Sequence, residues 1–528
     1  KHRNDELFPK FYRKKALLRF AQEEEICDGK KILKHPMIYL IDEQNKEVFY
    51  ELKKSITGGA SLVFHRYHEA DKTKITRIHY DTSKKDWDYD KTGKTGKTVK
   101  KIVGFDANAL YLGCSGGDML CGKLVLEETS DDKKYISDTL SGEFFGMLKV
   151  QLHVPEDKYE YFSQMCPIFK NIEYSQEEAG EYMKNIIKQN QGNPDKVKYT
   201  KSRKLICSLK ADNFWIKSTS LKWLLEHGCK VDKLYAVIKA TPGRPFKGFM
   251  DKVSDERRKG DIDKKYATIA DMWKTVGNSA VGRTAMNKSK HRNVKYCTEM
   301  EFNRLKYDYF YYDANVYNDV YEVISTKKKV KQNMPIQVAC SVYDDSKKRM
   351  LEFCYDCVDK YLDRSDYQYM EMDTDSAYIA LTGDFEELVK PELKEDFYKN
   401  YHKWFPRKDT AENAAYDKRT PCLLKIEWQG FGMVVLGSKM FFGISDEKDK
   451  DGNIIVKCSC KGIQHKNNSR ILNFEEYKRV LDSGNSNTCT NKGFRFINKE
   501  IVTYEVNKIG LSNVYVKGVV MKDGWHIR

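Results

Sequence analysis

The chain has 528 residues, 40% hydrophobic and 32% charged, so it is long enough for three or four subdomains of about 150 residues and is neither fibrous nor disordered. The sequence contains no apolar run of about eighteen residues, which argues against a membrane-spanning helix and a membrane partner. The formal net charge of +16 indicates a polyanionic partner such as nucleic acid, or else an excess of lysine that keeps a large protein soluble.

The N-terminal residues give no sign of export. Lys1 to Asp5 include no apolar signal segment and no initiator methionine, so we expect an intracellular, non-secreted protein whose sequence was cut from a longer one. Fourteen cysteines without a repeated spacing are typical of reduced thiols. Cys354 and Cys357 are spaced like half of a zinc site, but they fall in a helical pattern without a second pair. We therefore favour buried helix cysteines over zinc.

Two patterns towards the N-terminus resemble a metal site and a phosphate-binding loop. His65 and His68 are three residues apart, but no second pair of ligands supports a metal, so local packing or nucleic-acid contacts are the better interpretation. Lys91–Thr98 repeats Gly, Lys and Thr, yet a Walker A loop would need glycine at position 91. We predict a basic, glycine-containing hairpin or loop there.

The next element is a strand that ends in an acid. Lys100–Asp106 reads as a buried strand, and Ala107–Tyr111 follows it. A carboxylate at the end of a buried strand needs a partner for its charge. Asp106 is therefore a candidate functional acid.

A long helix is predicted over Asp263–Met286. An apolar stripe recurs at steps of three and four residues and comprises Tyr266, Ile269, Ala270, Trp273, Val276, Gly277 and Ala280. Lys274 and Asn278 are four apart and so stand one above the other on a neighbouring face. Lysine on a rigid helix suits phosphate oxygens, although any single such lysine is more often merely solvated.

The strongest local signal is a predicted β-hairpin over Gln368–Leu381. Two strand-forming runs flank Asp373-Thr374-Asp375-Ser376 at its tip. Asp side chains there either make an ordinary Asx-turn or share a divalent cation. With Asp106 as a third acid from an adjacent strand, the set is what a two-metal site requires.

Two further elements are predicted towards the C-terminus. Val456–Gly462 reads as a strand. Asn473 then opens a helix with a capping-box pattern, and Gly484 closes it.

Three motifs, in order, resemble those of family B DNA polymerases. They are Asp106-x-x-x-Leu110-Tyr111, Lys274-x-x-x-Asn278-Ser279-x-Val281-Gly282 and Asp373-Thr374-Asp375-Ser376. Ile56-Thr57-Gly58-Gly59 resembles the Tyr-x-Gly-Gly element of that family, and Ser438-Lys439-Met440-Phe441 resembles its Lys-x-Tyr motif. Ile56, Val281 and Phe441 stand where the family usually has tyrosine, so hydroxyls or rings are missing there but no charge is lost.

The resemblance is nearest to the protein-primed branch, including polymerases of Polinton-type (Maverick) elements and related viruses. Ser61–Glu69, Gly104–Tyr111 and Cys460-Lys461-Gly462 carry it. It implies that Arg283–Gln337, rich in aromatic and basic residues, is an insertion that contacts a terminal protein or helps to displace strands, as opposed to an ordinary surface elaboration.

The resemblance also implies a fold and its divisions. The fold class is α/β (α+β), a right-hand palm–fingers–thumb polymerase with an antiparallel palm sheet. The implied divisions are an N-terminal remnant or linker (1–56), a first palm part (57–245) with an insertion at about 113–200, fingers (246–282), a second palm part (283–445) with an insertion at about 286–333, and a thumb (446–528). Proofreading needs an Asp-x-Glu motif, which residues 1–55 lack, so we expect no exonuclease in this chain.

The implied roles follow the motifs. Asp106, Asp373 and Asp375 are catalytic, and Asp106, Asp375 and the backbone of Ala107 hold two Mg²⁺ ions, with Mn²⁺ as an alternative. The nucleotide-binding residues are Ala107, Asn108, Ala109, Leu110, Tyr111, Arg257, Lys274 and Asn278. Tyr111 is the floor under the sugar that excludes a 2′-hydroxyl. The residues for primer and template are Gly58, Gly59, Thr374, Lys439 and Lys461.

The expected partners are primer–template DNA, deoxynucleoside triphosphates and a terminal protein that serves as primer. Other functions were weighed against this interpretation. A reverse transcriptase usually has an x-Asp-Asp hairpin, and a two-metal nuclease has no use for the Lys274 helix or Tyr111. A catalytically inactive scaffold that binds DNA or a terminal protein remains the alternative.

Overall fold

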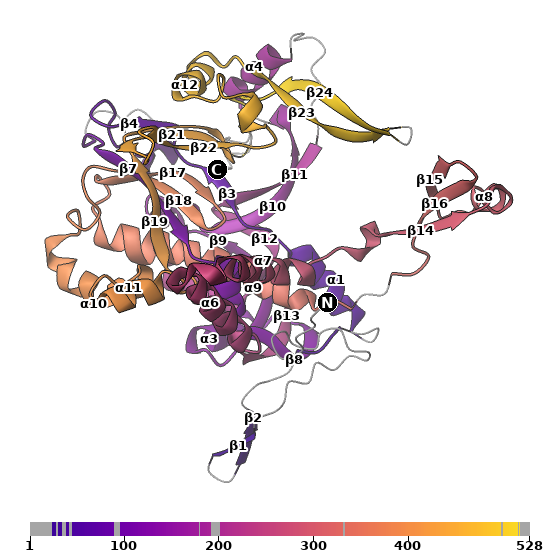
Figure 1. Cartoon of the computed structure of the whole chain (residues 1–528). Coiled ribbons are helices and arrows are strands. Elements are labelled where there is room, and N and C mark those ends of the chain that lie inside the picture. Colours follow the sequence, from indigo (N-terminus) through magenta and orange to yellow (C-terminus); the bar gives the residue numbers. More distant parts are fainter. Residues whose placement is uncertain are drawn as a thin grey trace.

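The computed structural model describes residues 24–27, 30–33, 38–41, 45–88, 96–178, 180–191, 201–330, 333–497, 500–515 and 517. Helices and antiparallel sheets are mixed along the chain (Figure 1). Residues 91–95 of the predicted basic loop, and most of residues 1–44, lie outside the described residues. No helix in the described parts is long and apolar enough to cross a membrane.

A five-stranded antiparallel sheet, here called the central sheet, forms the middle of the molecule. Its strand order is β19 (Leu424–Gly430), β7 (Lys101–Ala107), β18 (Ser376–Leu381), β17 (Tyr367–Asp373) and β3 (Ser61–Val63). Phe105, Tyr369 and Ile379 of these strands are buried in one core. That core also contains residues of α9 (Ile336–Glu352), of the π-helical segment Phe353–Asp359 and of α10 (Lys394–Trp404). The predicted strand ending near Asp106 is confirmed.

Cys354 and Cys357, the pair with zinc-like spacing, lie buried in the π-helical segment that continues α9. They contribute to the core beside Phe353 and Val358. The prediction that they are buried helix cysteines is therefore confirmed.

A second sheet continues from the central one towards the C-terminus. Its order is β22 (Ile454–Cys460), β21 (Met440–Lys448), β20 (Gly432–Gly437) and β4 (Tyr67–Glu69). Helix α12 (Phe474–Ser483) packs on it, and the hairpin β23 (Thr488–Ile497) with β24 (Glu500–Ile509) follows. The predicted cap is confirmed, since the Asn473 side chain accepts a hydrogen bond from the Glu476 N–H at 2.9 Å. Gly484 ends the helix with a φ of 72°.

A third sheet lies on the other side of the central one. Its order is β12 (Lys210–Lys217), β9 (Gly146–His153), β13 (Lys230–Gly243) and β8 (Met119–Glu128). The helices α1 (Lys46–Ser55) and α5 (Ser218–Glu226) contact it, and α3 (Asp132–Ser141) lies against α5 and β13.

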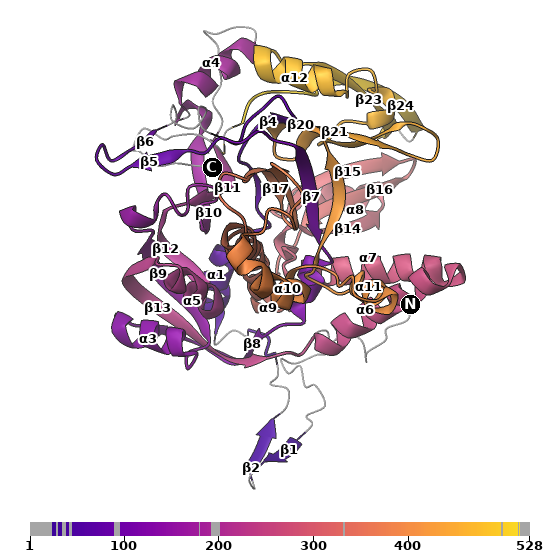
Figure 2. The same cartoon turned by 90° about the vertical axis from the view of Figure 1, so that its left-hand side faces the viewer.

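A two-stranded arm, β10 (Ile168–Ser175) and β11 (Lys201–Ser208), leads from this region to α4 (Glu181–Asn190). Figures 1 and 2 both show α4 beside α12. Two hydrogen bonds fasten them: Gln189 Nε2 donates to Ser483 O at 3.3 Å, and Asn190 Nδ2 donates to Gly484 O at 2.9 Å.

Helices α6 (Lys247–Ile262) and α7 (Ala267–Thr284) form a pair beside α2 (Leu110–Ser115). The predicted apolar stripe is covered only in part: Gly277 is buried, and Trp273 and Ala280 pack against a small core that includes Phe249 and Val253. Tyr266 is 38%, Ile269 44% and Val276 42% exposed, and the buried residues of α7 are Gly277, Val281 and Thr284. Helix α7 thus packs along a narrow line of small residues, where a closer approach of backbones is possible.

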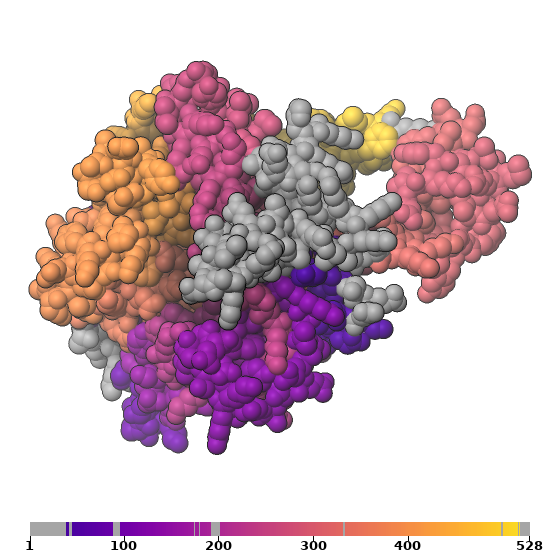
Figure 3. All heavy atoms as spheres, turned by 90° about the horizontal axis from the view of Figure 1, so that it is seen from below, coloured from indigo at the N-terminus to yellow at the C-terminus, as the bar shows by residue number. Residues whose placement is uncertain are grey.

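Residues 288–330 form a small unit that projects from the body, here called the outlying module (Figure 3). It consists of the sheet β14 (Arg292–Cys297), β16 (Val320–Thr326) and β15 (Tyr311–Tyr317), with α8 (Glu299–Leu305) against β16. The remaining elements are α11 (Ala411–Asp417) and the hairpins β1 (Glu24–Cys27) with β2 (Lys30–Leu33) and β5 (His79–Asp81) with β6 (Asp86–Asp88).

Candidate active site

The predicted carboxylate hairpin is present at one end of the central sheet. Asp373 ends β17 and Ser376 begins β18. Between them Thr374 takes a left-handed conformation with φ 62°, and its N–H donates to Ala60 O at 2.6 Å. The Asp375 N–H donates to Asp373 O at 2.7 Å. These backbone bonds fix a tight turn that carries both acids.

Asp106 lies on the neighbouring strand at the same end of the sheet. In the strand register it pairs with Ser376 on one side and with Lys425 on the other. The next residue, Ala107, donates its N–H to Asp375 O at 2.7 Å. The structure therefore brings Asp106, Asp373 and Asp375 together from residues more than 260 positions apart, and we call them the carboxylate site.

Burial and mutual repulsion shape the acidity of this site. Burial and the negative charge of Asp106 together raise the pKa of the Asp375 carboxyl to about 6. Burial also raises the pKa of Asp106, against the opposing effect of Lys425. Raised carboxyl pKa values at an exposed end of a sheet are typical of functional sites, because ionised acids are costly there without a cation.

Two lysines supply positive charge to the site. Lys425 Nζ lies 3.2 Å from Asp106 Oδ2, and Lys439 Nζ lies 3.0 Å from Asp373 Oδ2. Among the described residues no three His, Cys, Asp or Glu side chains are gathered closely enough to hold a metal ion. The donor chemistry nevertheless suits Mg²⁺, since carboxylate and carbonyl oxygens are the hard ligands that this ion prefers.

Tyr111 stands behind the carboxylates on α2. Its ring meets the ring of Tyr343 edge to face, with centroids 5.4 Å apart. A Cβ built on Gly59 would come within 2.7 Å of the Tyr111 hydroxyl and 2.5 Å of the Thr374 side chain. Only glycine therefore fits at position 59, whereas Gly58 faces open space. Burial raises the pKa of Tyr111 to about 12, so this hydroxyl stays protonated.

The segment between Asp106 and Tyr111 presents backbone rather than side chains. Ala107 and Leu110 are buried in the core, and Ala109 has a left-handed φ of 42°. The Asn108 side chain donates to Lys418 O at 2.9 Å, so its amide is used within the protein. The main chain of Asn108 is also used, since its N–H donates to Leu423 O at 2.9 Å and its carbonyl accepts from the Cys422 N–H at 2.8 Å.

Lys439 occupies the turn between β20 and β21 with φ 60°. Its carbonyl accepts a hydrogen bond from the Lys461 N–H at 3.1 Å, so both predicted primer-binding lysines come from adjacent strands. Lys517 also lies here, donating to Ser61 O at 2.9 Å. Burial lowers the pKa of Lys517, and the nearby charges of Lys204 and Lys461 lower it further.

Sequence reasoning missed Lys425, Lys517 and a buried acid, Glu371. Glu371 lies on β17 two residues before Asp373, and neither side-chain oxygen has a hydrogen-bond partner among the described residues. Burial and the charge of Asp373 raise its pKa well above the ordinary value. Lys425 could have been found only from its pairing with Asp106, and no sequence signal marks Lys517.

The predicted nucleotide-binding residues of the helix pair are placed differently. Lys274 and Asn278 are exposed on α7, and neither has a contact with the three acids in the described part of the chain. Arg257 is half-buried on α6, where burial and the charge of Arg419 lower its pKa. Arg419 itself is held by Asp261, to which its Nε donates at 2.5 Å and its Nη2 at 2.6 Å.

His65 and His68 stack on each other with ring centroids 4.3 Å apart. The His68 ring nitrogens lie 2.8 Å from Gln368 Oε1 and 2.9 Å from Thr73 Oγ1. The prediction of local packing is confirmed for this pair.

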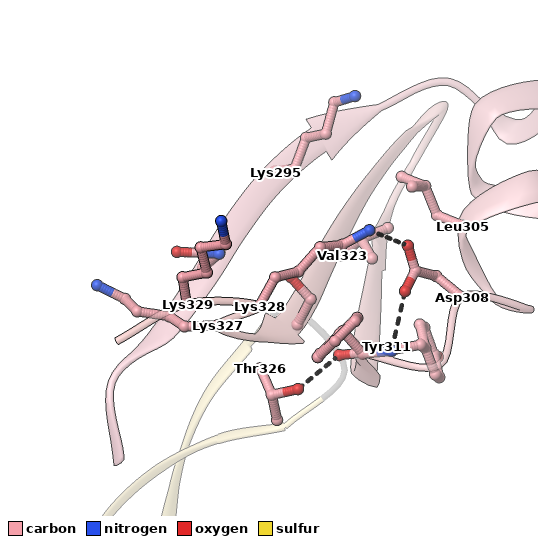
Figure 4. A pocket seen from close by; sticks show the side chains of 12 residues that line it. Lys295, Leu305, Asp308, Tyr311, Val323, Thr326, Lys327, Lys328 and Lys329 are labelled. Carbon is pink, nitrogen blue, oxygen red and sulfur yellow. Dashed lines mark hydrogen bonds and ion pairs between the residues drawn. The ribbon is translucent and has the colours of Figure 1, made fainter. Parts of the chain in front are cut away.

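A cavity of about 470 Å³ lies away from the carboxylate site, in the outlying module (Figure 4). Lys295, Lys327, Lys328 and Lys329 line it, and its only acid is Asp308, which accepts from Lys328 Nζ at 3.0 Å. This is a basic surface without the paired acids that phosphoryl transfer requires.

Comparison with known proteins gives limited information. No protein-family model matches the sequence, and no curated protein matches it. Among solved structures, phi29 DNA polymerase with single-stranded DNA, and the same polymerase with primer–template DNA and incoming nucleotides, each show 13% identity and a TM-score of 0.46 over 88% of this chain. The binary complex with primer–template DNA shows 12% identity and a TM-score of 0.45. This chain covers 62% of the length of those chains. Because the likeness is this low, the functional proposal depends on the residues of this chain.

Proposed function

We propose that this chain is a DNA-directed DNA polymerase that adds deoxynucleotides to a primer 3′-hydroxyl by two-metal phosphoryl transfer. The observation that carries the proposal is the placing of Asp106 beside Asp375 at the end of an antiparallel sheet. The order and spacing of the three motifs add support from the sequence. A fold of palm, fingers and thumb is part of this proposal, with the central sheet as the palm.

In this proposal Asp106, Asp375 and the carbonyl of Ala107 hold two Mg²⁺ ions, with Asp373 as a weaker or indirect ligand. The ions would activate the attacking 3′-oxygen and stabilise the leaving oxygen of an in-line displacement. Lys439 steadies the primer phosphate, together with Lys461. The N–H groups of Ala107 and Asn108 already donate to Asp375 O and Leu423 O, so in this scheme the amides of Ala109 and Leu110 meet the triphosphate.

The α6–α7 pair supplies cations to the nucleotide in the same scheme. Lys274 and Arg257 bind phosphate oxygens, and Asn278 contacts the incoming nucleotide from the same helix as Lys274. Because Lys274 is exposed and makes no ion pair with a described residue, its charge is available to a ligand. Tyr111 closes the floor under the sugar, where its ring leaves no room for a 2′-hydroxyl.

The experiment is primer extension on a labelled primer–template with Mg²⁺ and deoxynucleotides. We expect extension by the wild type and a loss of at least about 1,000-fold in Asp375→Asn, because the exchange removes a carboxylate that has no substitute. Asp308→Asn is the matched control, since it removes one carboxylate from the outlying module. It should extend like the wild type.

Folded wild-type protein that binds primer–template but does not extend it would contradict the proposal. That result would favour an inactive DNA-binding scaffold.

Protein priming, as in Polinton-type elements and related viruses, is a further proposal that rests on the motif resemblance. It is tested by looking for a labelled nucleotide that becomes covalently attached to a protein hydroxyl and survives heating in detergent. A strict requirement for a DNA primer would contradict it.

A further inference from the structure

The ring that supports Tyr111 comes from outside the three motifs. Tyr343 lies on α9, and its ring meets that of Tyr111 at an interplanar angle of 74° with centroids 5.4 Å apart. This edge-to-face geometry is the favourable arrangement for two aromatic rings. Val281, at the place where the motif resemblance expects a tyrosine, is buried in the main core instead.

Helix α9 also binds the Thr57–Gly59 loop, which contacts the hydroxyl end of Tyr111. Lys347 follows Tyr343 by four residues and therefore lies on the same side of the helix. Its Nζ donates to Thr57 Oγ1 at 2.5 Å and to Thr57 O at 3.1 Å. Lys347 is buried, and burial lowers its pKa to about 8 while Asp344 opposes that change. A buried lysine with these two bonds ties the Thr57–Gly59 loop to α9.

Gly59 then meets the tip of Tyr111. The space at its Cα is so limited that a Cβ would come within 2.7 Å of the Tyr111 hydroxyl. The ring of Tyr111 is thus confined at its hydroxyl by Gly59 and along its edge by Tyr343, and both contacts depend on α9. A half-buried tyrosine without such neighbours would have more than one side-chain rotamer available.

We infer that Tyr343 is a positioning residue for sugar selection: by holding the ring of Tyr111 in one rotamer, it sets how strongly the site rejects ribonucleotides. The inference rests on the proposed polymerase function and names a specificity determinant that no motif contains. If the Tyr343 ring is removed, Tyr111 can swing into the vacated space. The room that this movement opens is where a 2′-hydroxyl would lie.

The test compares ribonucleotide and deoxynucleotide insertion by wild type and Tyr343→Ala, as the ratio of kcat/KM for matched nucleotides. We expect the preference for deoxynucleotides to fall by about tenfold in Tyr343→Ala, mainly through a lower KM for the ribonucleotide. Tyr343→Phe keeps the ring and should keep the preference, because the ring edge makes the contact. Tyr111→Ala should give the largest loss of preference.

A stability control separates positioning from general damage to α9. Met350 is buried on the same helix, seven residues and so about 10 Å further along its axis. Met350→Ala should lower the melting temperature without changing the preference. An unchanged preference in Tyr343→Ala, with normal extension, would overturn this inference and leave the proposed function intact. Absence of any extension by the wild type would instead overturn the proposed function and this inference with it.

Discussion

The carboxylate site and the outlying module differ in almost every physical property. The acids of the carboxylate site are partly buried, interact with one another and are fixed by backbone hydrogen bonds. The module has a cavity of about 470 Å³ lined by lysines, and it exposes Tyr307 by 82% and Tyr309 by 93%. A polymeric substrate crosses an open surface, so chemistry of this kind is located by interacting acids rather than by cavity volume.

The comparison is sharpened most by removing one lysine from α7, on the proposed nucleotide-binding side, and one from the module. If the proposed function is correct, Lys274→Ala should lower kcat/KM for the incoming nucleotide by about 100-fold, because the charge proposed to bind its phosphates is lost. Lys329→Ala removes an exposed lysine charge from the module cavity and should leave this constant within about twofold. Steady-state single-nucleotide insertion measures both. A similar loss in the two variants would show that the module takes part in nucleotide binding.

Acid should destabilise the central sheet through His65 and His68. Burial lowers the pKa of His65 to about 4 and that of His68 to about 3. The folded state therefore binds fewer protons than the unfolded state below pH 6.5. The contribution of the two neutral histidines to the free energy of unfolding is complete above pH 6.5 and is lost as the pH falls towards 4.

At pH 4 the protonation of His65 should lower the free energy of unfolding, measured with urea, by about 3 kcal/mol. In His65→Gln the free energy of unfolding should depend on pH correspondingly less. His402 is exposed on α10, so His402→Gln is the control and should follow the wild type. Equal acid sensitivity of wild type and His65→Gln would exclude this histidine as the cause.

Deleting the module tests whether it acts independently of the carboxylate site. The Lys288 side chain donates to Asn333 Oδ1, so the two ends of the module lie close together. Replacing residues 291–329 by a short Gly-Ser linker should leave single-nucleotide insertion within about threefold of wild type. Affinity for DNA should fall by about tenfold, with a shallower dependence on salt, because several lysines are removed. Loss of insertion by the folded variant would show that the two regions act as one site.

The sequence predicted those parts of the molecule that local patterns determine. The hairpin at Asp373, the strand that ends near Asp106 and the cap at Asn473 each depend on residues within a few positions of one another. The pairing of the Asp106 strand with the Asp373 hairpin in one sheet was predicted from chemistry, because a carboxylate at the end of a buried strand needs a partner for its charge. Roles for Lys274, Asn278 and Arg257 remain predictions, because these side chains lie on α6 and α7 without a contact to the acids in the described chain.

Tertiary packing determined the features that the sequence did not show. Lys425 faces Asp106 only because β19 pairs with β7, and Tyr343 reaches Tyr111 only because α9 crosses behind α2. The apolar stripe of α7 includes Gly277, which forms the contact, but also Ile269, which stays exposed. Hydrophobic spacing identifies a stripe but does not say whether a partner covers it.

The final described residues of the chain complete the edge of its central sheet. The Tyr515 hydroxyl accepts a hydrogen bond from the Val63 N–H at 2.8 Å, and the two residues are 452 positions apart. Arg66 likewise donates to Leu436 O at 2.7 Å and to Asn513 O at 3.1 Å. During synthesis at 5–20 residues per second, β3 would wait about 20–90 s for these partners. A nascent chain would therefore carry an uncovered strand edge until Tyr515 has been synthesised, which makes this stage of folding a natural point for chaperone binding or aggregation.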